Sequence, residues 1–95
     1  MIGERKIQLN GKEVSLRFDW GAVEDFCEAE GVTFSDFDKA VQSPKKLRLL
    51  IYHMAISAGE KIKKDDLRAM AFSQMTIVSQ LIEEAMGEGK EAGEK

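Results

Sequence analysis

The sequence predicts an α+β fold that is predominantly helical, an N-terminal β-hairpin followed by about five helices. Two observations predict it: residues 4–18 alternate between apolar and polar types, and the chain from Trp20 onward repeats its apolar residues at helical spacing. A chain of 95 residues has the size of one domain. We therefore expect a single domain over residues 1–87, followed by a polar flexible tail over residues 88–95, EGKEAGEK.

The predicted hairpin spans residues 4–18. Its two alternating runs are separated by Asn10-Gly11, a pair that adopts positive φ at low cost and favours a two-residue turn. A lone hairpin is only marginally stable in water. We therefore expect its apolar face to lie on the following helices or to join a sheet in a neighbouring chain.

The first two helices are predicted at about residues 20–30 and 34–42. In the first, Gly31 is the expected C-terminal cap, and the expected inward residues are Trp20, Val23, Phe26 and Cys27. In the second, Thr33 with Asp36 resembles a capping box. Its expected buried residues are Phe34, Phe37 and Val41.

The third helix is predicted at about residues 44–58, because Ser43 can cap its start, Pro44 suits its first position and Gly59 ends it. It is apolar on two sides, so it lies either inside its own domain or partly against another subunit. Two further helices are predicted at about residues 64–72 and 74–86.

Composition argues against several classes of protein. The net charge of −3 does not suit a domain that neutralises phosphates. No apolar run approaches the roughly 20 residues that a membrane helix needs, and no signal-peptide core is evident. A single cysteine cannot form an internal disulfide. We expect a cytoplasmic protein that binds neither membrane nor nucleic acid.

Catalytic chemistry is not expected. His53 is the only histidine and has no acid or cysteine three or four residues away, and Cys27 lies on the predicted buried stripe, where a free cysteine behaves as a small hydrophobe. We predict no catalytic residues, no bound cofactor and no metal ligands, hence no enzyme.

Binding of another protein is the remaining expectation. The predicted partner or self-association surface comprises Leu49, Tyr52, His53, Ile56, Met70, Phe72 and Ile77. Charge is also uneven, since residues 19–38 hold seven acids and no base whereas residues 39–68 hold eight bases and three acids. These charges are either ordinary solvated helix faces or patches that favour contact between copies in a possible homo-oligomer.

Four passages carry a resemblance to a known family. They are KIQLNGKEVSLRFDWGAVEDFCEAEG, VTFSDFDKAV, SPKKLRLLIYHMAISAGEK and KIKKDDLRAMAF with the amphipathic segment after it. Over about residues 4–86 the chain resembles the tail assembly chaperones of long-tailed bacteriophages and related prophages. It departs from the family where Lys63 or Lys64 stands in place of the usual Thr or Ser cap.

The resemblance implies a non-enzymatic morphogenesis factor of the bacterial host cytoplasm, not expected in the finished virion. Its implied partners are the tape measure protein and the tail tube protein. An alternative function is a small helix-turn-helix-like DNA-binding regulator, because the last two predicted helices have suitable dimensions. The exposed positions of the last helix carry no Arg or Lys, which argues against that alternative.

Overall fold

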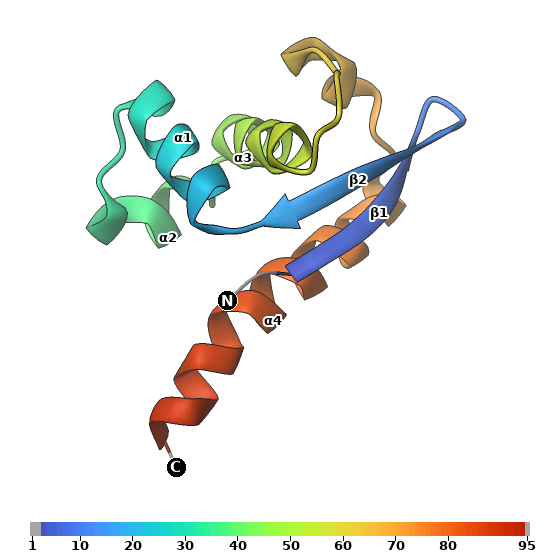
Figure 1. The fold of residues 1–95 in the computed structure, drawn as a ribbon. Coiled ribbons are helices and arrows are strands. Elements are labelled where there is room, and N and C mark those ends of the chain that lie inside the picture. The colour runs from blue at the N-terminus through green and yellow to red at the C-terminus, as the bar shows by residue number, and fades with distance from the viewer. Residues whose placement is uncertain (1–2, 95) are drawn as a thin grey trace.

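The computed structural model describes the backbone of residues 3–94 and the side chains of residues 3–86. It confirms the predicted α+β, mainly helical fold (Figure 1). Two strands, four α-helices and three short 3-10 helices follow one another along this part of the chain. In order they are β1 (Gly3–Leu9), β2 (Lys12–Phe18), α1 (Trp20–Glu30), η1 (Phe34–Asp36), α2 (Phe37–Ala40), α3 (Pro44–Ser57), η2 (Lys64–Ala69), η3 (Phe72–Gln74) and α4 (Met75–Glu94).

The antiparallel hairpin has the turn that the sequence predicts. Asn10 and Gly11 adopt φ angles of 53° and 78°, and Leu9 pairs with Lys12 beside them. The buried side chains alternate along both strands and belong to Ile7, Leu9, Val14, Leu16 and Phe18. The apolar face therefore lies inside the chain's own fold.

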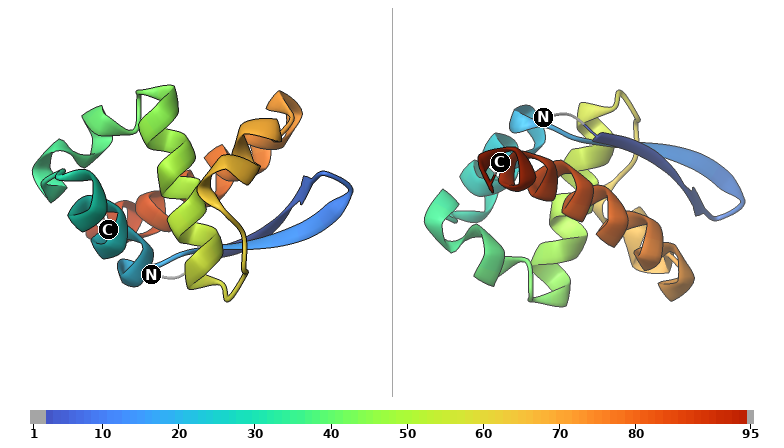
Figure 2. Two further views of the ribbon diagram at one scale, coloured as in Figure 1. Left: turned by 90° about the horizontal axis from the view of Figure 1, so that it is seen from above. Right: turned by 90° about the horizontal axis from the view of Figure 1, so that it is seen from below.

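Two helices cover the hairpin (Figures 1 and 2). α3 packs against β2, and α4 packs against β1, where Arg5 and Glu84 form an ion pair. Side chains also accept hydrogen bonds from the strand backbone. The Gln8 N–H donates to Gln74 Oε1 at 2.8 Å, and the Ser15 N–H donates to Glu60 Oε2 at 2.7 Å. These contacts occupy backbone donors that a further strand would need.

The end of α1 and the start of α3 follow the predicted capping, and Asp19 caps the start of α1. The Asp19 carboxylate accepts the Ala22 N–H at 2.9 Å and the Ser57 O–H at 2.8 Å, which ties the start of α1 to the end of α3. Gly31 ends α1 in the left-handed conformation, with φ of 66°. Ser43 caps α3, and Pro44 occupies its first turn.

The prediction of an α-helix at 64–72 was wrong. Residues Lys64–Ala69 form the 3-10 helix η2, and Met70 and Ala71 are extended. The segment is too short to be stable as an isolated helix, and Leu67 is the one residue of η2 that is buried in the core. The predicted helix at 34–42 is likewise divided into η1 and α2.

The last helix also differs from the prediction. It continues through Gly87 to Glu94, whereas the sequence predicted an end at Met86 and a flexible tail over 88–95. The Glu, Lys and Ala residues after Gly87 favour helix, whereas Gly87, Gly89 and Gly93 each cost about 1 kcal/mol relative to Ala. Residue 95 lies outside the described residues.

Candidate functional site

Large apolar side chains that remain exposed gather at two hollows of the surface. The first, here the aromatic hollow, has a volume of about 180 Å³ and lies between α1, α2 and α4. Its apolar lining includes Phe18, Trp20, Val23, Phe34, Phe37 and Met86. The second, here the basic hollow, has a volume of about 420 Å³ and lies between α3, η2, η3 and the start of α4. Its apolar lining is Leu47, Ile51, Leu67, Met70, Phe72 and Met75.

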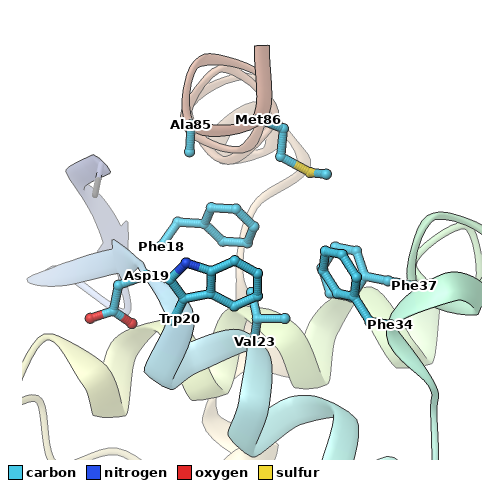
Figure 3. Close-up of a pocket in the computed structure, with 8 residues that line it drawn as sticks. All are labelled: Phe18, Asp19, Trp20, Val23, Phe34, Phe37, Ala85 and Met86. Carbon is cyan, nitrogen blue, oxygen red and sulfur yellow. The ribbon is translucent and has the colours of Figure 1, made fainter. Parts of the chain in front are cut away.

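Aromatic rings in successive contact form much of the aromatic hollow (Figure 3). Phe37 is buried and meets Phe26 edge-on, with ring centroids 5.7 Å apart. Phe34 stacks on Phe37 at 6.1 Å, and Trp20 lies 5.5 Å from Phe34. Phe37 thus anchors an outer pair of rings, of which Trp20 is 61% and Phe34 57% exposed. Rings held in place but open to solvent are typical of protein-binding surfaces.

Asp19 stands at the edge of the aromatic hollow, but its carboxylate is already occupied. Both of its oxygens accept the Ser57 hydroxyl, and one also accepts the Ala22 N–H. The rest of the lining is apolar apart from backbone. The hollow is smaller than the roughly 300–1,000 Å³ of most small-molecule sites, so it suits an apolar side chain of a partner.

The basic hollow combines an apolar floor with a cationic rim. Lys45, Arg48 and Arg68 contribute the rim, and no acidic residue joins them in its lining among residues 3–86. Arg48 donates to the Lys64 carbonyl at 2.9 Å, which holds η2 against α3. Phe72 projects beside the hollow and is 93% exposed.

The structure separates the seven predicted surface residues. Met70 and Phe72 lie together in the basic hollow, but the other five line neither hollow. Leu49 is buried, which contradicts its predicted place on an exposed face, because α3 packs against α1, β2 and η2 and is covered on more than one side. The remaining residues, Tyr52, His53, Ile56 and Ile77, are half-buried or exposed.

Sequence reasoning missed Trp20, Phe34 and Met86 as surface residues. Trp20 and Phe34 were expected to face inward, yet both are exposed. The buried stripe of α1 is centred on Ala22, Val23 and Phe26, which leaves Trp20 at its margin. A signal existed, since Trp20 is the first residue of its helix and precedes all of its buried residues.

His53 sits among rings on α3. Its ring lies 5.1 Å from that of Tyr52 and 6.4 Å from that of Phe26, and its Nε2 is buried with no hydrogen-bond partner among the described residues. Burial lowers the pKa of His53, and nearby Lys64 adds to this, while Asp25 and Glu30 oppose it. A neutral, packed imidazole follows at neutral pH.

Cys27 is half-buried on α1, and burial raises the pKa of its thiol, which lowers the fraction of reactive thiolate. No group of three or more metal-ligating side chains occurs within the part of the chain that the structure describes. Within the same part, every helix is too short or too polar to cross a membrane.

Comparisons of the chain with models of known protein families, with curated proteins and with solved structures gave no match.

Proposed function

We propose that this chain is a non-enzymatic tail assembly chaperone, which binds the tape measure protein of a phage or prophage and helps to recruit tail tube subunits in the host cytoplasm. The resemblance of about residues 4–86 to that family suggests this role. The exposure of Trp20, Phe34 and Phe72 around two hollows supports it.

A client of this kind needs a partner that covers its apolar surface before assembly. A long helical protein that has not yet been assembled exposes apolar stripes, which associate unless a partner covers them. Each aromatic side chain buried on binding contributes at most roughly 1.5–3 kcal/mol, and the cost of association offsets much of this gain, so a few such anchors favour a weak, reversible complex. Reversible binding suits a factor that leaves before the tail is complete.

A DNA-binding regulator has less support. The segment that would form the first helix of a helix-turn-helix is a 3-10 helix followed by extended residues. The exposed α4 residues Thr76, Ser79, Gln80, Glu83 and Glu84 include two acids and no base, which is unfavourable next to phosphate.

Co-purification tests the proposal. The chain is co-expressed with fragments of a phage tape measure protein, and complexes are isolated through a tag on the fragment. We expect a complex that the double variant Trp20→Ser/Phe72→Ser weakens at least tenfold. Ile56→Ser is the matched control, because Ile56 is also an exposed large apolar residue but lines neither hollow.

The proposal fails if no fragment of the tape measure protein co-purifies, or if the Ile56→Ser control weakens the complex as much as the double variant does. The second result would place the binding surface on the side of α3 that carries Ile56.

A further inference from the structure

The two hollows share one wall, which is a single side of α4. Met75 lines the basic hollow and Met86 lines the aromatic hollow. At 100° per residue, Met75, the half-buried Ile82 and Met86 fall within about 40° of one another around the helix axis. These side chains, with the exposed Ser79 beside them, form a mainly apolar stripe that joins the two hollows along α4.

The opposite walls also belong to neighbouring segments. Phe34 of η1 and Phe37 of α2 line the aromatic hollow together with Met86 of α4 (Figure 3), and the start of α3 lines the basic hollow together with Met75. Met75 and Met86 lie roughly 16 Å apart along the axis at about 1.5 Å per residue. About three turns of a partner helix cover that distance, with side chains placed in each hollow.

The two ends of this stripe differ in charge. The basic hollow has Lys45, Arg48 and Arg68 in its lining. The aromatic hollow has only Asp19 as a charged lining residue among those described, and most of its lining comes from the stretch 19–38, which holds seven acids and no base. Glu83 adds another exposed acid on α4 beside Met86. A partner helix that spans both hollows therefore meets the acids Asp19 and Glu83 at one end and the bases Lys45, Arg48 and Arg68 at the other.

From this arrangement we infer that the stripe receives an amphipathic helix of the client in one direction, with its N-terminal end at the aromatic hollow and its C-terminal end at the basic hollow. A helix carries partial positive charge at its N-terminus and partial negative charge at its C-terminus, so this direction matches both ends. The bound helix runs antiparallel to α4, is basic in its first part and acidic in its last part, and has apolar anchors between. The inference rests on the proposed client-binding function and specifies the chemistry of the client segment.

Synthetic peptides test the direction. Both peptides are acetylated, amidated and hydrocarbon-stapled on the outer face, and both carry leucine anchors at the spacing of Met75, Ile82 and Met86. One has lysines in its first third and glutamates in its last third, and the other has these charges exchanged. The quenching or shift of the fluorescence of Trp20, the only tryptophan, reports binding.

We expect the lysine-first peptide to bind roughly three- to tenfold more tightly than the reversed one, the range for a few rim charges. Lys45→Glu/Arg68→Glu removes this preference, because both residues line the basic hollow and neither forms an ion pair with the described residues. Lys12→Glu/Lys61→Glu is the matched control with the same change in net charge and keeps the preference, since neither residue lines a hollow.

Several results would overturn the inference. Equal affinities or a preference for the reversed peptide would contradict the direction, and binding of neither peptide would remove the stripe as a helix site. If the wild type binds no peptide but self-associates, and Lys45→Glu/Arg68→Glu abolishes that self-association, the stripe would be assigned to a second copy of the chain. Co-purification with the tape measure protein is scored separately, so a complex that persists while the peptides fail leaves the proposed function intact and rejects only this inference.

Discussion

Two phenylalanines of this chain provide a direct test of how its rings divide between core and surface. Phe37 is 2% exposed and contacts Phe18, Phe26 and Phe34, whereas Phe72 is 93% exposed. The substitutions Phe37→Ala and Phe72→Ala remove the same atoms from these two environments. A large difference in the free energy of unfolding is therefore expected.

The magnitude follows from burial and ring contacts. Withdrawing a phenyl ring from water is worth roughly 1.5–3 kcal/mol, and the cavity and lost ring pairs bring the cost of Phe37→Ala to about 3–5 kcal/mol. Phe72→Ala changes the free energy of unfolding by no more than about 0.5 kcal/mol, as for other surface sites. In a domain of this size, 1 kcal/mol corresponds to about 4–8 °C in Tm, so Phe37→Ala lowers Tm by at least about 12 °C.

Urea unfolding followed by circular dichroism measures both variants. We expect the Phe37→Ala midpoint to fall by more than about 1 M urea and the Phe72→Ala midpoint to stay with the wild type. Equal losses for the two variants, or a loss below about 1 kcal/mol for Phe37→Ala, would refute the assignment of Phe37 to the core and Phe72 to the surface.

Three further predictions concern caps and pH. Asp19→Ala lowers the free energy of unfolding by about 1–2 kcal/mol in urea titration, because the Ala22 N–H and Ser57 hydroxyl lose their acceptor; full stability in this variant would contradict the capping role. Gly31→Ala lowers the free energy of unfolding by about 1 kcal/mol, because φ at Gly31 is 66°, whereas Gly21→Ala, inside α1, does not lower it. Equal effects of the two substitutions would show that the left-handed conformation of Gly31 does not determine the loss of stability. Burial lowers the pKa of His53 below 6.5, so the unfolded chain binds a proton at this residue more readily than the folded chain does, and the free energy of unfolding falls as the pH drops below about 6.5. His53→Gln should lose this part of the pH dependence between about pH 7.5 and 5. An unchanged profile of stability against pH would count against a buried neutral ring.

The sequence predicted the local elements well where side chains fix the backbone. Asn10-Gly11 sets the hairpin turn, Gly31 ends α1, and Ser43 with Pro44 starts α3. In these places a few adjacent residues decide the conformation. They need no knowledge of the tertiary fold.

Features that depend on packing between distant segments were predicted less well. Leu49 is buried because three elements pack around α3, and the 3-10 form of η2 depends on Leu67 reaching the core. Trp20 is exposed because it lies at the margin of the buried stripe of α1. The aromatic hollow brings together residues near positions 18–37 and Met86, which no local pattern places side by side.

The central claim is that the α4 stripe and its two hollows bind the client. The methionine side chains allow this claim to be tested within one sample. Methyl NMR on the labelled protein follows each methionine as a tape measure fragment is added. We predict shifts for Met70, Met75 and Met86, which line the hollows, and none for Met54, which is fully buried in the core. A complex that forms while Met75 and Met86 keep their free positions would contradict the claim.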